Sequence, residues 1–595
     1  MKCIIHIRPD SKKRSNVNEI GRCIMGESKS DQALDEYLKR PWIKWYGKDV
    51  PPDIKVPETN IVEVLDENCK KWGDKVALIF FGKKVKHKEI REQSLRFATA
   101  LHDLGIRKGD VVAIYLPNCP QFVIAYHGIL RLGATVTTIS PLYTSREIAH
   151  QLRDSRAKMI VCLDLHYDKV QKALEEVKID HVIITSMSDY LSGSGSVLAR
   201  VRGKSPKEEI GKAEGLLHFS DLLGKYPPNP PDVKISPDDI AALPYTGGTT
   251  GDPKGAVLTH RNVVALQEQM HRAYTKIEDG KEIAVAVLPF YHIYGQSVIM
   301  LTGTFRGGTA ILFPTPELNE ILDAIQDYNI TLFYGVPTLY KYLLDAPGIK
   351  RVNWKKAKYL FCGADTLHET TRKQWIRITG REINEGYGLT ETTAVSHTNP
   401  QDRNKPGSFG VPLPSTYAAV ADPDKNEFVA PGEPGELVLN GPQIMREYFN
   451  KPEENAKCFF EARGMRWFRT GDIVRMDEEG YFYFVERKKD LIKYKGLSVY
   501  ANEIEEVLYK HPKIKEAAVI GVPDPEVGAR VKAIVVCETD YRGKITEEEI
   551  MKYCEERLAH YKVPKIVEFR GEVPKTDVGK VDHKRLREEI FKLEK

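Results

Sequence analysis

The sequence lacks the features that would place the chain in a membrane, on nucleic acid or around a structural metal. It has no uninterrupted apolar run of the about 20 residues that a membrane span needs. The net charge of +5 is small for 595 residues, so bulk charge gives no case for a nucleic-acid partner. The nine cysteines form no Cys-x-x-Cys pair and no Cys/His cluster, which argues against structural zinc and indicates a reducing compartment. We therefore expect a cytoplasmic protein.

The length of the chain requires more than one domain, because single hydrophobic cores stop growing at about 250–300 residues. Residues 1–30 mix basic and acidic side chains, and their apolar stretch is too short for a signal-peptide core. We expect them to be a disordered extension. Residues 31–486 are predicted to form a large N-terminal domain and residues 487–595 a smaller, mobile C-terminal domain, with the hinge at the polar residues 487–490.

Apolar strands alternate with amphipathic helices over most of the larger domain, which predicts layered α/β subdomains with parallel sheets. Near residue 415 the pattern changes to alternating strands, typical of an antiparallel β-rich subdomain, and the smaller domain is predicted to be α+β. Helices are predicted at residues 61–72, 94–104, 503–510 and 546–559. Strands are predicted at residues 76–81, 111–116, 159–163, 181–185, 240–243, 283–288, 310–313, 331–334, 416–420, 435–439, 481–485, 516–522 and 531–538.

The stretch YTGGTTGDPKG at residues 245–255 combines four glycines, three threonines and a lysine. Glycine permits positive φ and a close approach of ligand to backbone, and free amides in such a loop form an anion-binding concavity. The loop differs from a Walker A motif, in which Ser or Thr follows Gly-Lys. A glycine-rich turn without a ligand is the alternative. The loop follows a predicted strand, where α/β proteins bind ligands, and by itself it predicts phosphate binding only.

Five further motifs occur after this loop. They are FCGAD (361–365), EGYGLTET (385–392), RTGD (469–472) and the pair ERKKDLIKYKG (486–496) and PKTDVGK (574–580) in the last part of the chain. In this order and spacing they resemble the AMP-forming acyl-CoA synthetases, whose adenylate-forming superfamily includes coumarate-CoA ligases, luciferases and peptide-synthetase adenylation domains. The resemblance runs from about residue 40 to the end. It implies that a carboxylate attacks the α-phosphate of ATP, and that coenzyme A then displaces AMP from the acyl-adenylate.

The resemblance also implies a role for individual positions in binding ATP and Mg²⁺. The catalytic residues would be Lys254, Thr390, Glu391 and Lys580. The β- and γ-phosphates would bind Thr246, Gly247, Gly248, Thr249, Thr250, Gly251 and Lys254. The nucleoside and the α-phosphate would contact Gly363, Ala364, Glu385, Gly386, Tyr387, Gly388, Leu389 and Thr390, with the ribose on Asp472 and Arg487. Mg²⁺ would bind Glu391 and Thr246.

In the family the smaller domain rotates between the two half-reactions. Lys580 matches the lysine that bridges the substrate carboxylate and the α-phosphate, and Lys489 matches the hinge. Rotation would bring in Lys495 and Gly496 to bind coenzyme A, while Lys493 would contact the AMP phosphate. For each of these residues the alternative is an ordinary cap, turn or solvated side chain, and their place within motifs favours the functional interpretation.

The identity of the acid is less strongly indicated. His292, in LPFYHIYG at residues 288–295, would border the acyl pocket together with Tyr334 and Gly335. No acidic residue lies between residues 285 and 298, which disfavours an amino-acid substrate because its buried ammonium group would be unpaired. The TGGTTG form of the phosphate loop resembles bacterial fatty-acyl-CoA synthetases and favours a medium- or long-chain fatty acid.

Three alternatives remain open at this stage. An aryl acid is the other substrate class, and a luciferase-like oxygenase would share every adenylation motif. A catalytically silent lipid- or nucleotide-binding scaffold would be expected to have lost Glu391, Asp472, Arg487 or Lys580, and all four are present. The sequence leaves open the chain length of the acid, peripheral contact with a membrane and the oligomeric state, a dimer included.

Overall fold

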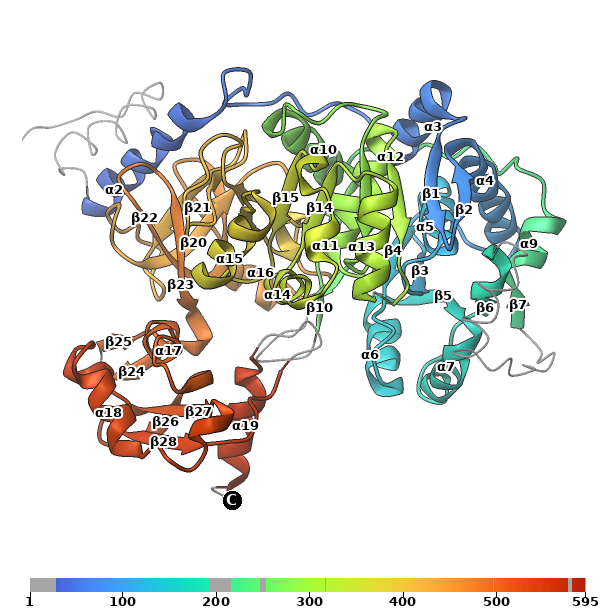
Figure 1. Cartoon of the computed structure of the whole chain (residues 1–595). Coiled ribbons are helices and arrows are strands. Elements are labelled where there is room, and N and C mark those ends of the chain that lie inside the picture. Colours follow the sequence, from blue (N-terminus) through green and yellow to red (C-terminus); the bar gives the residue numbers. More distant parts are fainter. Residues whose placement is uncertain are drawn as a thin grey trace, which may run out of the picture.

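The computed structural model in Figure 1 describes residues 28–191, 216–246, 253–315, 317–495, 497–575 and 581–593. A larger part runs from α2 (Lys29–Leu38) to β23 (Phe482–Arg487), and a smaller part from β24 (Ile492–Tyr494) to α19 (His583–Leu593). A 3-10 turn, η8 (Lys488–Asp490), joins them. The predicted α/β class with a smaller α+β part is confirmed.

A seven-stranded sheet is built mostly from residues before the glycine-rich loop. Its strands are parallel apart from β11, which pairs antiparallel with β8 at one edge. All side chains of β3 are buried, as expected for a parallel strand covered on both faces. The order is β11 (Leu258–Thr259), β8 (Ile240–Ala242), β4 (Thr135–Thr138), β3 (Val111–Tyr115), β5 (Ala157–Leu163), β6 (His181–Thr185) and β7 (Leu216–His218), with helices α5 (Pro120–Arg131), α6 (Ser145–Ser155), α7 (Tyr167–Leu174) and α9 (Phe219–Lys225).

A nine-stranded sheet follows, parallel in its centre and antiparallel at both ends. It shares one hydrophobic core with the first sheet, in which Ile114 of β3 and Phe80 of β1 both lie. The order is β18 (Val411–Pro412), β17 (His397–Thr398), β16 (Asn384–Tyr387), β15 (Tyr359–Cys362), β14 (Leu332–Gly335), β12 (Ile283–Ala286), β13 (Thr309–Leu312), β1 (Val76–Phe80) and β2 (Lys83–Lys86). The helices are α3 (Ile61–Trp72), α4 (His87–Asp103), α10 (His260–Ala273), α11 (Ile293–Gly295), α12 (Thr302–Arg306), α13 (Leu318–Asp327), α14 (Pro337–Asp345) and α15 (Glu369–Thr379).

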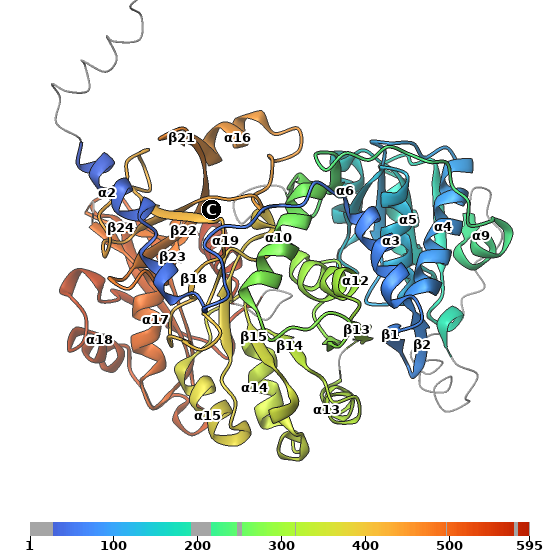
Figure 2. The same cartoon turned by 90° about the horizontal axis from the view of Figure 1, so that it is seen from above.

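An antiparallel sheet completes the larger part, and the change of pattern predicted near residue 415 is confirmed. Leu34 and Tyr37 of α2 pack into its core, so the first described helix lies against strands about 400 residues later in the chain (Figure 2). Because α2 begins at Lys29, the boundary expected at residue 30 falls inside this helix. The sheet contains β19 (Tyr417–Ala421), β20 (Gly435–Asn440), β22 (Met465–Met476), β21 (Phe459–Ala462) and β23, and α16 (Pro452–Cys458) precedes β21.

The smaller part is a five-stranded sheet with three helices. Thr546 accepts a hydrogen bond from the backbone of Glu549, and Asp582 from that of Arg585, so each caps the helix that follows it. The helix predicted through residue 559 ends at Glu555, and the helix predicted at residues 94–104 begins earlier, at His87. The elements are β25 (Leu497–Val499), β24, β27 (Gly528–Cys537), β26 (Ile514–Asp524), β28 (Ile566–Phe569), α17 (Ala501–Tyr509), α18 (Glu547–Glu555) and α19. None of the helices described in either part combines the length and apolarity needed to cross a membrane.

The aromatic cluster beneath α15 gives a test of this packing. Trp375 is fully buried and meets the rings of Tyr340 and Trp354 edge-on, each at 4.8 Å between centroids. We expect Trp375→Ala to lower the free energy of unfolding by about 3–5 kcal/mol, measured by urea denaturation, because it leaves a cavity. Tyr342→Ala is the control, since that side chain is 57% exposed on α14 and should change stability by no more than about 0.5 kcal/mol. Equal losses would contradict this account.

Candidate active site

The glycine-rich loop projects from a short antiparallel hairpin. Tyr245–Thr246 (β9) pairs with Lys254–Gly255 (β10), which holds the two ends of the loop together. The strand predicted before the loop is present as β8, and the Tyr245 hydroxyl donates to Asp154 Oδ2 of α6 at 2.8 Å. The hairpin is therefore anchored to the seven-stranded sheet. Gly247, Gly248, Thr249, Thr250 and Gly251 lie outside the described residues.

Lys254 is held by residues that the sequence analysis did not select. Its ammonium group pairs with Glu454 of α16 and lies 4.8 Å from the centre of the Tyr448 ring, a cation–π distance. Asn455 holds the backbone of Tyr448 through two hydrogen bonds, at 2.7 and 2.9 Å. In the sequence, Glu454 is one of several acidic residues in the first turn of a helix, which is ordinary for a solvated helix start. No sequence signal pointed to these contacts.

Glu391 lies on the other side of Tyr448. It is buried in a 3-10 turn, η7 (Thr390–Thr392), that follows β16, and its Oε1 accepts a hydrogen bond from the Tyr448 hydroxyl at 2.6 Å. Burial raises the pKa of Glu391, and the bond from Tyr448 partly opposes that shift. One tyrosine thus contacts both Lys254, through its ring, and Glu391, through its hydroxyl.

A second cluster joins Tyr387, Asp472 and Arg487. The carboxylate of Asp472 is fully buried on β22 and accepts a hydrogen bond from the Tyr387 hydroxyl at 2.6 Å. Arg487, directly opposite on β23, places Nη1 2.5 Å from the other carboxylate oxygen, and Asp472 raises the pKa of this guanidinium group. The Tyr387 ring stacks on Phe409 with 4.5 Å between centroids. The structure therefore brings together three residues predicted to bind the nucleoside.

The glycines of this region permit close backbone contacts. A Cβ atom at Gly388 would lie 1.9 Å from the carbonyl oxygen of Ala394, so no larger residue fits without rearrangement. A Cβ atom at Gly363 would lie 3.3 Å from the ring of Tyr294, and Ala364 has a φ of +71°. Gly386 lies within β16 and Leu389 precedes η7, whereas the Glu385 side chain is buried and burial raises its pKa to about 7.

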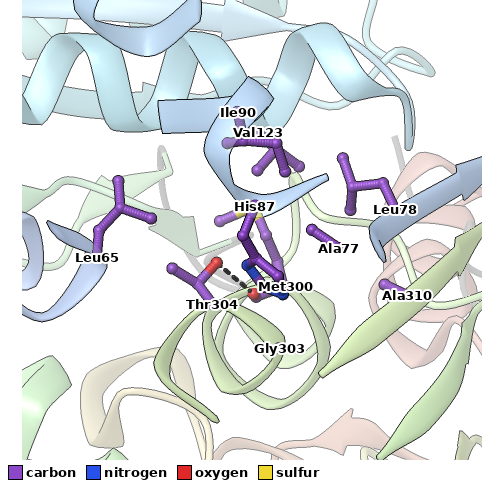
Figure 3. Close-up of a pocket in the computed structure, with 10 residues that line it drawn as sticks. All are labelled: Leu65, Ala77, Leu78, His87, Ile90, Val123, Met300, Gly303, Thr304 and Ala310. Carbon is purple, nitrogen blue, oxygen red and sulfur yellow. Dashed lines mark hydrogen bonds between the residues drawn. The ribbon is translucent and has the colours of Figure 1, made fainter. Parts of the chain in front are cut away.

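The residues predicted for the acyl pocket differ in their surroundings. His292 is exposed, and its Nδ1 accepts from the backbone of Tyr294 at the start of α11. Tyr334 is buried and stacks on Phe361 at 4.9 Å, so its ring is part of the core, and Gly335 lies against Tyr340. None of the three lines the pocket in Figure 3, which lies around His87 and Thr304. That cavity, about 10 Å³, has room for about one water molecule.

Among the residues predicted from the smaller part, Lys489 lies in η8, two residues after Arg487 of the second cluster, and burial lowers the pKa of its ammonium group to about 8. Lys493 and Lys495 are exposed on the hairpin β24–β25, which Figure 1 shows in the smaller part, apart from the hairpin β9–β10. The structure does not bring them beside Glu391 in this arrangement. Gly496 and Lys580 lie outside the described residues.

Comparison with known proteins places these clusters in a family. The profile of the AMP-binding enzyme matches residues 65–449, and that of the AMP-binding enzyme C-terminal domain matches residues 503–580. The chain belongs to the AMP-binding enzyme family. Lys254, Tyr387, Glu391 and Tyr448 lie within the first match, whereas Glu454, Asp472 and Arg487 lie between the two matches.

Curated members of the family are similar over nearly the whole chain. A long-chain-fatty-acid–CoA ligase of Bacillus subtilis is 39% identical over 93% of this chain and 98% of its own length. The corresponding Escherichia coli O157:H7 ligase is 37% identical, with the same coverage. A 4-coumarate-CoA ligase of Narcissus pseudonarcissus is 30% identical over 90% of this chain and 95% of its own.

Solved structures of the family share the fold. ATP-bound MatB from Rhodopseudomonas palustris superposes with a TM-score of 0.79 at 27% identity, covering 91% of this chain and all of that one. Apo MatB from the same organism superposes with a TM-score of 0.69 at the same identity and coverage.

The tyrosine between Lys254 and Glu391 gives a test of the site. We expect Tyr448→Phe to lower the rate of ATP–pyrophosphate exchange about tenfold, because a buried carboxylate loses a hydrogen-bond donor. Tyr481→Phe is the matched control: its hydroxyl donates to the Arg403 carbonyl at 3.1 Å, outside both clusters. If both variants lost the same activity, Tyr448 would have no particular part in the site.

Proposed function

We propose that this chain is an ATP-dependent ligase that converts a medium- or long-chain fatty acid into its coenzyme A thioester. The observation that carries the proposal is 39% identity, over 93% of the chain, to a long-chain-fatty-acid–CoA ligase. The two clusters described above, which gather residues for phosphate and nucleoside binding, support it. ATP and coenzyme A are the co-substrates, and AMP and pyrophosphate are the products.

The reaction proceeds in two balanced steps. A carboxylate oxygen of the acid forms a bond to the α-phosphorus of ATP while the bond to the β-phosphate oxygen breaks, which releases pyrophosphate. The thiol of coenzyme A then loses its proton and its sulfur bonds to the acyl carbon, while the carbon–oxygen bond to AMP breaks. Because the first step brings anions together, positive groups and oriented donors must offset their charge.

Lys254 and Thr246 stand at the two ends of the phosphate loop and would bind the β- and γ-phosphates. Glu391 would bind Mg²⁺ with phosphate oxygens, because this ion favours few carboxylates and oxygen ligands from substrate. Among the described residues no cluster of three or more His, Cys, Asp and Glu side chains is arranged to hold a metal. A bound ion would offset phosphate charge, and the burial of Glu391 suits a carboxylate that gains a cation with its substrate.

The second cluster would hold the nucleoside. One face of the Tyr387 ring packs on Phe409, so adenine would stack on the other face, beside the backbone of Gly363 and Ala364. Asp472 would accept hydrogen bonds from the ribose hydroxyls, with Arg487 paired to the same carboxylate. Thr390, next to Glu391, would donate to the α-phosphate.

The relative placement of the two parts favours the adenylation step. The chain superposes better on the ATP-bound form of MatB than on its apo form, with TM-scores of 0.79 and 0.69. In this arrangement Lys580 would bridge the carboxylate and the α-phosphate. Rotation of the smaller part about Lys489 would then move Lys580 away from the site and bring in the exposed hairpin that carries Lys493, Lys495 and Gly496.

An aryl acid is the second candidate substrate, supported by 30% identity to a 4-coumarate-CoA ligase. A panel of acids separates the two. We expect pyrophosphate exchange and coenzyme A-dependent AMP release with octanoate or palmitate, and little of either with acetate, a cinnamate or amino acids. Activity only with the cinnamate would favour the aryl class. ATP binding without exchange on any acid would contradict the enzymatic proposal and favour a scaffold.

The proposed role of Lys580 makes a separate prediction. We expect Lys580→Ala to lower adenylation by about 10²–10³, the usual loss for one electrostatic stabiliser, and to affect thioester formation from supplied acyl-adenylate much less. Lys575→Ala is the control, because that side chain pairs with Glu516 within the smaller part and should leave both half-reactions unchanged. Equal losses in both half-reactions of the Lys580 variant would overturn its assignment to the first step.

A further inference from the structure

Helix α17 of the smaller part receives its N-terminal cap from the larger part. The first amides of a helix have no partner within it and need an acceptor from elsewhere. Tyr500 occupies the N-cap position, and within the described chain its side chain makes no capping hydrogen bond. The backbone amide of Asn502, in the first turn, donates instead to Glu486 Oε2 at 2.7 Å. Glu486 lies on β23, before the hinge.

The buried carboxylate of Glu486 is held in place by hydrogen bonds to both of its oxygens. Its side chain is 6% exposed, and its other oxygen, Oε1, accepts from the backbone of Arg487 at 2.9 Å. Both carboxylate oxygens therefore bind backbone amides. Burial raises the pKa of Glu486 to about 7, and the acidic groups of Glu505 and Asp490 add to the shift. A carboxylate buried in this way is stable only while its hydrogen-bond partners stay in place.

The bond from Asn502 to Glu486 crosses the hinge, whereas two neighbouring ion pairs among the described residues do not. Asp490 pairs with Arg587, and Glu505 binds His583 at 2.8 Å, both within the smaller part or its connection to the hinge. Rotation about Lys489 would preserve these two pairs. It would separate Glu486 from Asn502. The ring contact between Tyr509 of α17 and His368 of the larger part, at 5.4 Å, would separate with it.

We propose that Glu486 is a positioning residue that holds the smaller part in the arrangement used for adenylation by capping α17 across the hinge. Losing this cap is part of the change to the arrangement that uses coenzyme A. The inference rests on the proposed function, because it assigns the observed arrangement to the first half-reaction. It predicts that weakening the cap affects the two half-reactions differently, which a purely structural role would not do.

The test compares Glu486→Gln with Glu505→Gln in the full-length chain. Glu505 is also a buried carboxylate that accepts a backbone hydrogen bond, from Val519 at 2.7 Å. Its described hydrogen-bond partners, Val519 and His583, both lie in the smaller part. With palmitate, we expect Glu486→Gln to lower ATP–pyrophosphate exchange about tenfold, the scale of a lost helix cap. Thioester formation from supplied palmitoyl-adenylate and coenzyme A should be unchanged or faster. Glu505→Gln should change both half-reactions by the same factor.

The outcomes separate this inference from the proposed function. If the unsubstituted protein shows both half-reactions and Glu486→Gln leaves their ratio unchanged, the inference is overturned and the function stands. If the unsubstituted protein shows neither, the proposed function fails. Small-angle scattering with ATP then tests the cap alone, since Glu486→Gln should shift the profile while Glu505→Gln should not. Should the Gln variant not fold, Glu486→Asp, which keeps the charge on a shorter side chain, provides the same comparison.

Discussion

The hydrogen bond from Tyr448 to Glu391 stands where segments from several sheets of the larger part meet. Lys254 lies in the two-stranded hairpin β9–β10, Glu391 follows β16 of the nine-stranded sheet, and Tyr448 lies between β20 of the antiparallel sheet and α16. Backbone bonds reinforce this junction, from Val257 to Glu447 and from Met445 to Glu391. The segment around Tyr448 therefore links residues that come from different sheets and holds them in one site.

Buried carboxylates recur at these junctions, each satisfied in a different way. Glu391 accepts a hydrogen bond from a tyrosine hydroxyl. Asp472 pairs with an arginine and also accepts a hydrogen bond from a tyrosine hydroxyl, and Glu486 accepts hydrogen bonds from backbone amides. Burial of a carboxylate is costly unless such partners are supplied. The differences suit the tasks proposed for them: Glu391 would take a cation, Asp472 would accept hydrogen bonds from the ribose hydroxyls, and Glu486 holds a helix of the smaller part.

Much of the fold was predictable because its signals are local. The apolar runs at residues 111–116 and 181–185 are long enough to specify strands, and the caps at Thr546 and Asp582 depend on neighbouring residues. The residues around the nucleoside were selected because they belong to motifs. Glu454 and Glu486 were missed, because their partners lie about 200 residues away or across a hinge, and an acidic residue carries no sign of such a partner.

The sequence by itself determined the class of chemistry, since the glycine-rich loop and the motifs after it specify which side chains and which flexible backbone are available to ATP. It also predicted many of the strands, which depend on hydrophobic periodicity, and both ends of α3. Only the tertiary structure decided which distant residues meet. Tyr448 links Lys254 to Glu391, Tyr334 packs in the core, and Glu486 caps α17. These contacts depend on how sheets and helices that are distant in the sequence pack together, and the local sequence does not contain that information.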